Sequence, residues 1–238
     1  MHRQYLHQVA ELLNWIEQTQ GTAIQQAAEI VAQAVAGGGL VYTFGSGHSQ
    51  LVARDAAFRA GGLVSLVHLP DPAWGLFERI EGTGLALLSQ YPVRSGEAIF
   101  VISNSGRNPE PIEVALAARQ KDLKVIAILS MQHATSVGSR HSSGKKLDEL
   151  ADVALDTGAP SGDAVLSFPG LEERVGPVST ILGATLLHAV IVEAIQNLIT
   201  HGITPPILIS INLEGAIEHN LSLLARFPDI AWVPKYSL

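Results

Sequence analysis

The sequence contains no cysteine, and charged residues make up only 16% of its 238 positions. The absence of cysteine excludes disulfide bonds, thiol catalysis and thiolate metal ligands. With 15 basic and 22 acidic residues the net charge is −7, and aromatic residues make up only 5% of the chain. An acidic chain repels polyanions, and few aromatic side chains are present to stack on bases, so we expect no nucleic-acid partner.

Long uninterrupted hydrophobic runs are also missing, although hydrophobic residues reach 47% and the mean hydropathy is +0.26. The most apolar stretch, residues 181–199, is interrupted by His188, Glu193 and two amide side chains. We therefore expect no membrane-spanning helix, and the N-terminus lacks the apolar core of a signal peptide. Such a composition buries a sizeable core and excludes disorder over most of the chain. We expect one cytoplasmic domain over residues 1–238.

The spacing of apolar residues changes along the chain. Residues 1–36 show helical spacing, and short branched apolar runs then alternate with helix-like segments. Strands that are apolar on both faces are typical of a parallel sheet covered by helices. The sequence predicts an α/β doubly wound fold, with a mostly parallel five-stranded sheet over residues 37–200, N-terminal helices over 1–36 and a C-terminal extension over 201–238. The expected strands are 40–44, 63–67, 98–102, 125–129 and 153–155, and the expected helices after residue 36 are 49–60, 76–89, 109–121, 178–200 and 214–226.

Two of the expected strands end in similar turns, GSGHS at 45–49 and SNSGRN at 103–108. Ligands of open α/β sheets bind at the carboxyl ends of strands, near a switch in strand order. Glycines let backbone N–H groups approach a ligand, the following helix presents its positive end, and serine hydroxyls add donors without charge. The two turns therefore predict an anion cradle built from neutral donors. The alternative is that Ser, Asn and Gly only form turns and helix caps here.

Most of residues 37–200 is covered by five segments: VYTFGSGHSQLVARDAAFRAGG, FVISNSGRNPEPIEVALAAR, KVIAILS, LADVALD and GPVSTILGATLLHAVIVEAI. These segments resemble the SIS (sugar isomerase) domain, a phosphosugar-binding family. The resemblance is closest to an uncharacterised bacterial branch of stand-alone SIS domains related to phosphoheptose isomerases, in which FGxGHS, SNSGRN, SRHSSGK and a terminal EHN recur. It implies the SIS fold, a sugar phosphate as ligand, and a homodimer or homotetramer whose neighbouring chains complete each site.

The resemblance also implies which side chains hold the ligand. In the family, the serines of the second turn and the residue three positions beyond the second serine bind the phosphate. The first turn and the start of the last long helix also lie near the ligand. The corresponding residues here are Ser103, Ser105 and Asn108 in the second turn, Ser46, His48 and Ser49 in the first, and Ser179 and Thr180 on the helix.

The catalytic residues of the known isomerases are mostly replaced. Phosphoheptose isomerases use a metal-centred site whose positions here read Asp55, Arg59, Thr180 and His188, and only His188 keeps the family residue. The positions used by arabinose-5-phosphate isomerases hold His48, Trp74 and Arg107. No close pair of histidines has metal-ligand spacing either. We therefore expect no metal and no cofactor.

Proton chemistry would fall to the remaining titratable residues, because aldose–ketose isomerisation needs a base and an acid. By elimination, the candidate base is Glu81, with His48 or His219 assisting. His141, Glu172 and His188 are further candidates, and each of these side chains also has a purely structural alternative. Convergence of Glu81, His48 and His219 on one pocket would favour a sugar-phosphate isomerase, whereas separation would favour a non-catalytic binding or sensing module. The polar loop 139–146 is expected to be either a lid or a solvated surface loop.

Overall fold

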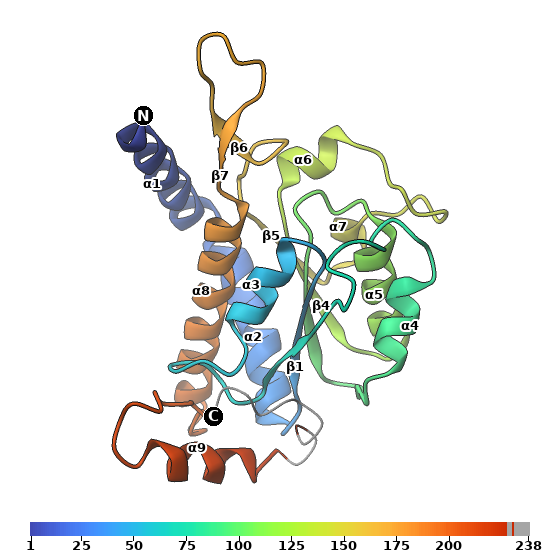
Figure 1. Cartoon of the computed structure of the whole chain (residues 1–238). Coiled ribbons are helices and arrows are strands. Elements are labelled where there is room, and N and C mark those ends of the chain that lie inside the picture. Colours follow the sequence, from blue (N-terminus) through green and yellow to red (C-terminus); the bar gives the residue numbers. More distant parts are fainter. Residues whose placement is uncertain (228–229, 231–238) are drawn as a thin grey trace.

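The computed structural model describes residues 1–227 and residue 230 (Figure 1). Its centre is a five-stranded sheet in the order β2-β1-β3-β4-β5, with every neighbouring pair parallel. This arrangement confirms the α/β doubly wound fold. The strands are β1 (Val41–Gly45), β2 (Leu66–Leu69), β3 (Ala98–Ile102), β4 (Lys124–Leu129) and β5 (Val153–Asp156).

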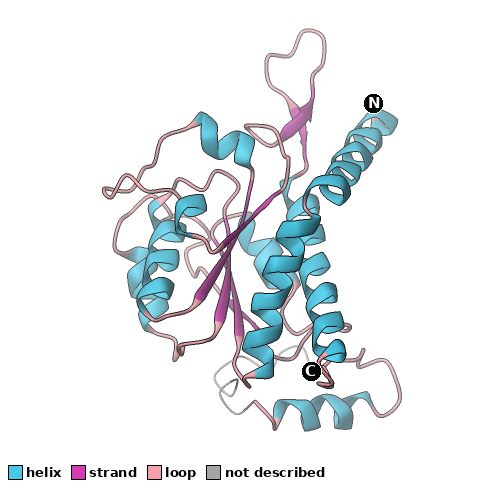
Figure 2. Cartoon of the chain, turned by 180° about the vertical axis from the view of Figure 1, so that it is seen from behind, coloured by secondary structure: helices cyan, strands magenta, loops and turns pink. Residues whose placement is uncertain are grey.

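Helices cover both faces of the sheet (Figures 1 and 2). Strand β3 shows why: Phe100 packs in the core cluster on one face, while Ile99 and Val101 pack in the cluster on the other. Alternate side chains of a strand point to opposite faces, so an uninterrupted apolar strand needs cover on both sides. One face carries α2 (Gly21–Ala36), α3 (Ser49–Asp55) and α8 (Ser179–Thr200), and the other carries α4 (Thr83–Ser89), α5 (Pro109–Gln120) and α7 (Leu147–Leu150).

Two regions differ from the sequence prediction. The helix expected over 76–89 is confined to α4, because Gly82 adopts a positive φ of 95° and the chain before it forms turns. The structure also contains elements that were not among the expected strands and helices: α6 (Met131–Ser136) and an antiparallel hairpin of β6 (Ala164–Leu166) and β7 (Val175–Pro177). Strands of three residues are too short to show a period. The base of the hairpin lies beside α1 (His2–Thr19), where the Tyr5 hydroxyl donates to the Pro177 carbonyl at 2.8 Å.

The C-terminal region packs at the end of the sheet that lies opposite the carboxyl ends of the strands. Its backbone pairs with the chain before β2 through a bridge between Leu63 and Ile207, and Leu208 is buried. Helix α9 (Ala216–Leu224) follows, near the C-terminal end of α8 (Figure 1). The rest of the expected extension, residues 228–229 and 231–238, lies outside the described residues.

Helix α8 is long and apolar enough to cross a membrane by length and composition, the one such helix within the described residues. Its Leu182, Leu186 and Val190 side chains are fully buried and belong to the same core cluster as residues of α2 and α3. A buried core helix is expected to have this composition, so the packing of α8 accounts for its hydropathy.

Candidate functional site

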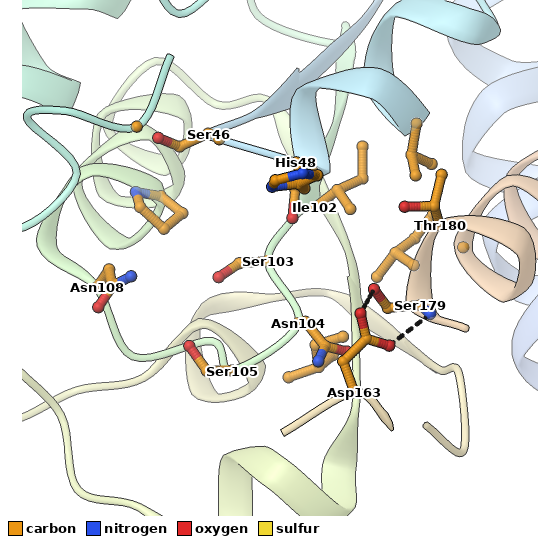
Figure 3. Close-up of a pocket in the computed structure, with 18 of the residues that line it drawn as sticks. Ser46, His48, Ile102, Ser103, Asn104, Ser105, Asn108, Asp163, Ser179 and Thr180 are labelled. Carbon is orange, nitrogen blue, oxygen red and sulfur yellow. Dashed lines mark hydrogen bonds between the residues drawn. The ribbon is translucent and has the colours of Figure 1, made fainter. Parts of the chain in front are cut away.

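A cavity of about 430 Å³ opens at the carboxyl ends of β1 and β3 (Figure 3). This is the switch point of the sheet, because the chain continues from β1 to β2 on one side and from β3 to β4 on the other. Such a crevice is the usual ligand site of an open α/β fold. All eight residues expected to contact a phosphosugar line this cavity: Ser46, His48, Ser49, Ser103, Ser105, Asn108, Ser179 and Thr180.

The second turn supplies hydrogen-bond donors to the cavity. Its Ser103 N–H donates to the Ile128 carbonyl at 3.0 Å, which fixes the turn against β4. Arg140 Nη1 donates to Asn108 Oδ1 at 2.8 Å. Because Arg140 engages the amide oxygen, the amide nitrogen of Asn108 is the part of the side chain left to bind a ligand, and it lies towards Ser103 in Figure 3. The hydroxyls of Ser103 and Ser105 and this amide therefore form a neutral donor set.

The helix that follows the second turn does not offer the backbone donors that the sequence suggested. The first turn of α5 contains Pro109 and Pro111, which have no N–H group. The N–H of Glu110 between them donates to the Glu78 carbonyl at 3.1 Å. An anion at this turn would therefore depend on side-chain donors and on the N–H groups of the turn itself.

The first turn is held by the segment that follows β2. A Cβ atom on Gly75 would lie 2.9 Å from the Gly47 Cα, so only glycine allows the two backbones to approach this closely. Ser46 is 8% exposed, and its Oγ lies 2.8 Å from Asp71 Oδ2 and 2.8 Å from Glu110 Oε2. Burial is the main reason that the pKa of Glu110 is raised to about 7; the hydrogen bond to Ser46 lowers the pKa, and the neighbouring Asp71 charge contributes to raising it. Two buried carboxyl groups thus share the hydroxyl of one cavity-lining serine.

The start of α8 is capped by an acidic residue that the sequence analysis did not identify. Asp163 Oδ1 accepts the N–H groups of Val178 and Ser179, at 3.0 and 2.6 Å, and Asp163 Oδ2 accepts the Ser179 hydroxyl at 2.8 Å (Figure 3). The carboxylate therefore offsets the positive end of this helix. Both Ser179 and Thr180 line the cavity. The Ser179 hydroxyl already donates its hydrogen bond to Asp163, whereas Thr180 is exposed.

The three candidate catalytic residues do not converge. His48 lines the cavity, but neither Glu81 nor His219 is among the lining residues. Glu81 accepts hydrogen bonds from the N–H of Ser142 at 2.6 Å and from its hydroxyl at 2.7 Å, and these bonds lower the pKa of the Glu81 carboxyl. The Nε2 atom of His219 pairs with the Ile207 carbonyl at 3.0 Å. His219 lies on α9, near the C-terminal end of α8. Because α8 has 22 residues, this end is roughly 33 Å along α8 from Ser179.

The loop 139–146 lies beside the cavity rim. Arg140 reaches Asn108, Ser142 reaches Glu81, and His141 Nε2 lies 3.6 Å from the buried Glu113 carboxylate. The loop is therefore anchored on both α5 and the turn before α4. Its action as a lid stays a prediction.

The remaining candidates lie away from the cavity. His188 Nε2 pairs with Asp55 at 2.8 Å, and Asp55 also pairs with Arg59 on the same surface. Glu172 is exposed in the loop of the β6–β7 hairpin. Within residues 1–227 and 230, no three His, Asp or Glu side chains form a group that could hold a metal ion. The expectation of no metal and no cofactor stays a prediction.

Two further titratable residues, Glu78 and His133, line the cavity. Burial, and next to it the charge of Arg107, lowers the pKa of His133, which favours the neutral form of this ring. Glu78 comes only three residues before Glu81 within the helix expected over 76–89, and nothing in the sequence pattern distinguished the two carboxylates. The sequence indicated Arg140 only as a member of the polar loop 139–146, because its contact with Asn108 depends on the folded position of that loop.

Comparisons with known proteins agree with this fold. A family model described as the SIS domain matches residues 4–130, which is more than half of the chain. The UPF0309 protein lmo0025 of Listeria monocytogenes is 39% identical over 225 residues, 94% of this chain and 96% of the relative. The UPF0309 protein GK1441 of Geobacillus kaustophilus is 36% identical over 245 residues, 99% of this chain and 94% of the relative. The chain therefore belongs to the SIS-domain family and, within it, to the UPF0309 proteins.

Solved structures share the fold at low sequence identity. The phosphoheptose isomerase GmhA of Neisseria gonorrhoeae superposes with a TM-score of 0.58 at 20% identity, covering 82% of this chain and 96% of that one. The Vibrio vulnificus NanR protein, complexed with ManNAc-6P, gives 0.52 at 19% identity and covers 95% and 67%. The Escherichia coli CFT073 protein c3406, also solved in complex with a sugar phosphate, gives 0.55 at 16% identity and covers 85% and 90%.

Proposed function

We propose that the cavity at the ends of β1 and β3 binds a sugar phosphate. The observation that carries this proposal is the donor set of Ser103, Ser105 and Asn108, which meets on one wall of the cavity without a carboxylate among its three side chains. Hydroxyl and amide donors bind a phosphate group through charge-assisted hydrogen bonds. Two SIS-fold neighbours, NanR and c3406, were solved with sugar phosphates bound, which supports this ligand class.

The polarity of the cavity wall orients the ligand. Ser103, Ser105 and Asn108 are placed to donate, so the phosphate belongs at the second turn. The Ser179 hydroxyl donates its hydrogen bond to Asp163, so its oxygen is left to accept hydrogen bonds from the ligand. The opposite wall thus suits the hydroxyl groups of the sugar.

A thermal-shift screen tests the proposed ligand class. A ligand that binds only the native state raises the unfolding temperature as its concentration exceeds its Kd. The panel contains pentose and hexose phosphates, N-acetylated hexosamine phosphates, the parent sugars and inorganic phosphate. We expect stabilisation by at least one sugar phosphate and much less by its parent sugar. Equal stabilisation by phosphorylated and parent sugars would reject the proposal.

Aldose–ketose isomerisation of the bound sugar phosphate is the second candidate function, because Glu78 and His48 both line the cavity. A carboxylate and an imidazole are sufficient for proton transfer between adjacent sugar carbons. Glu81 stays a candidate base, although its hydrogen bonds to Ser142 make it a weaker one. A sensing module that holds the ligand without turnover is the alternative that the separation of Glu81, His48 and His219 favours.

Solvent deuterium exchange into C1 and C2 of the sugar distinguishes these candidates. An isomerase incorporates deuterium, and a general base contributes about 10²–10⁴-fold, so the variant that loses its base also loses exchange. We compare wild type with Glu78→Gln and Glu81→Gln, and we expect the larger loss for Glu78→Gln. Absence of exchange with every sugar phosphate that binds would leave the sensing module as the function.

We further propose that the protein acts in the cytoplasm as a single SIS domain over residues 1–238, assembled as a homodimer or homotetramer without nucleic-acid or membrane partners. Val192 and Ile199 of α8 are 65% and 54% exposed, and a second copy of the chain would bury such apolar surface. Light scattering at micromolar concentration tests the assembly. A monomer that still binds its ligand normally would contradict it.

A further inference from the structure

The hydroxyl group of Ser46 has two acidic neighbours and only one proton. Its Oγ lies 2.8 Å from Asp71 Oδ2 and 2.8 Å from Glu110 Oε2. An oxygen–oxygen distance of 2.8 Å is a hydrogen bond, and each of the two bonds needs its own hydrogen. Serine supplies one hydrogen and an ionised carboxylate supplies none. The second hydrogen must therefore come from a protonated carboxyl group.

The surroundings of the two acids show which of them carries this proton. Asp71 accepts the N–H of Ala73 at 2.8 Å and that of Gly75 at 2.6 Å, in addition to the Ser46 hydroxyl. Two backbone N–H donors, apart from Ser46, engage this carboxylate, so both of its oxygens act as acceptors, as those of an unprotonated carboxyl group do. Among the described residues, the Glu110 side chain has a single hydrogen-bond partner, Ser46. The proton therefore belongs to Glu110.

The charges around Glu110 agree with this assignment. Asp71 faces it from the segment after β2, Glu78 from the following turn, and Glu113 from its own helix α5, so all three neighbours are acidic. Two positively ionisable side chains of the loop 139–146 face these neighbours: His141 lies 3.6 Å from Glu113, and Arg140 interacts with Glu78. Burial together with the three acids holds the pKa of Glu110 at about 7.

Glu110 also borders a second cavity on its other side. This cavity has a volume of about 360 Å³, and Pro70, Phe77 and Leu87 are among its lining residues. The described lining of this cavity includes no basic side chain that would favour an ionised Glu110. The protonated form is therefore consistent with both sides of the carboxyl group.

On the basis of the proposed function, we infer that Glu110 donates its proton to Ser46, and that Ser46 therefore presents a lone pair to the cavity and binds a hydroxyl group of the sugar. Ser46 donates to Asp71 and accepts from Glu110, so its remaining hydrogen-bonding capacity is one acceptor site. A phosphate oxygen at this position would meet that lone pair and the Asp71 charge. Ser46 is thus a specificity-determining residue for the hydroxyl end of the ligand, and Glu110 is a positioning residue.

The first arm of the test needs no ligand. Infrared difference spectra of the full-length protein between pH 6 and pH 8.5 report the loss of any carboxylic acid C=O band in that interval. We expect such a band in wild type and in the exposed control Glu172→Gln, with a midpoint near pH 7, and its absence in Glu110→Gln. A wild-type difference spectrum without this band, or one that Glu110→Gln leaves unchanged, would overturn the inference.

The second arm measures affinity with arabinose 5-phosphate and fructose 6-phosphate as probes. The glutamine amide of Glu110→Gln donates to Ser46 at every pH, whereas wild type loses its donor as pH rises. With a midpoint near pH 7, only about one tenth of wild type is binding-competent at pH 8, so Glu110→Gln should bind about tenfold more tightly than wild type at pH 8 and equally at pH 6. Ionisation of the probe's phosphate affects the affinity of both proteins equally, so it cancels in the ratio of their affinities at each pH.

The outcomes separate this inference from the proposed function. An affinity ratio that is the same at both pH values would reject the role of Glu110. Ser46→Ala should bind the probes more weakly and without the extra loss above pH 7, and retention of that loss would also reject the inference. If neither probe binds at any pH, the ligand assignment fails for these sugars, while the infrared arm still decides where the proton lies.

Discussion

The guanidinium group of Arg140 donates a 2.8 Å hydrogen bond from Nη1 to Oδ1 of Asn108, and this contact joins the loop 139–146 to the phosphate end of the cavity. The contact sets which face of the Asn108 amide the ligand meets. A residue of the loop thereby acts on the site although it is not among the cavity-lining residues.

Arg140→Ala should weaken sugar-phosphate binding by roughly 1 kcal/mol, because Asn108 loses the bond that orients its amide. Arg79→Ala is the matched control, since Arg79 is a nearby exposed cation that contributes to the local charge around Arg140. Calorimetric titration should show a larger loss for Arg140→Ala than for Arg79→Ala. Equal losses would mean that Arg140 acts only through its charge.

Ser105→Ala should weaken the same ligand by roughly 1–3 kcal/mol, because a charge-assisted hydrogen bond is lost. Ser105→Asp should weaken it further, because a negative charge is added next to the phosphate. Ser89→Ala, on the exposed face of α4, serves as the control and should bind as wild type does. Unchanged affinity of both Ser105 variants would remove this turn from the phosphate site.

Glu110 should make the protein less stable as pH rises. Its pKa is raised from 4.5 to about 7 in the folded protein, so the folded state binds the proton more tightly than the unfolded state does. The proton therefore contributes roughly 3 kcal/mol to the free energy of unfolding. This contribution is fully present below pH 4.5 and is lost as the pH rises through about 7. Urea unfolding at pH 5, 6, 7 and 8 should show wild type losing stability relative to Glu110→Gln. Parallel curves for the two proteins would contradict the assignment.

Glu97 ties the starts of β1 and β3 together, far from the cavity. Its buried carboxylate accepts the Leu40 N–H at 3.0 Å, the Tyr42 hydroxyl at 3.0 Å and the Arg94 N–H at 2.7 Å. Glu97→Ala leaves these donors without their acceptor and should lower the free energy of unfolding by about 3 kcal/mol. Ligand affinity of the folded fraction should not change. A loss below about 0.5 kcal/mol in urea unfolding would show that water replaces the carboxylate.

The sheet was predictable from the sequence because its strands are apolar on both faces. Strand β3 falls on the expected residues 98–102, whereas β2 begins at Leu66 rather than at residue 63, because Leu63 pairs with Ile207 instead. That pairing joins parts of the chain far apart in sequence, and no local pattern reveals it. The β6–β7 hairpin was missed for a related reason, since its three-residue strands are fixed by contacts such as Tyr5 with Pro177.

The lining of the cavity was predictable to the extent that turns at strand ends determine it. The serines and Asn108 follow directly from the positions of β1 and β3 and from the family resemblance. The protonation of Glu110, the Asp163 cap and the position of Glu78 were not predictable, because each depends on side chains that meet only after folding. Elimination among sequence positions selected Glu81, which accepts hydrogen bonds from Ser142 of the loop; its role as a base stays a prediction.

The second turn is expected to recognise the phosphate group of a sugar phosphate. The decisive experiment is calorimetric titration of wild type and Ser105→Asp, each with a sugar phosphate from the panel and with its unphosphorylated parent. We expect saturable binding only for wild type with the phosphorylated sugar, and a large loss in Ser105→Asp. Comparable binding of the parent sugar, or an unaffected Ser105→Asp, would contradict it.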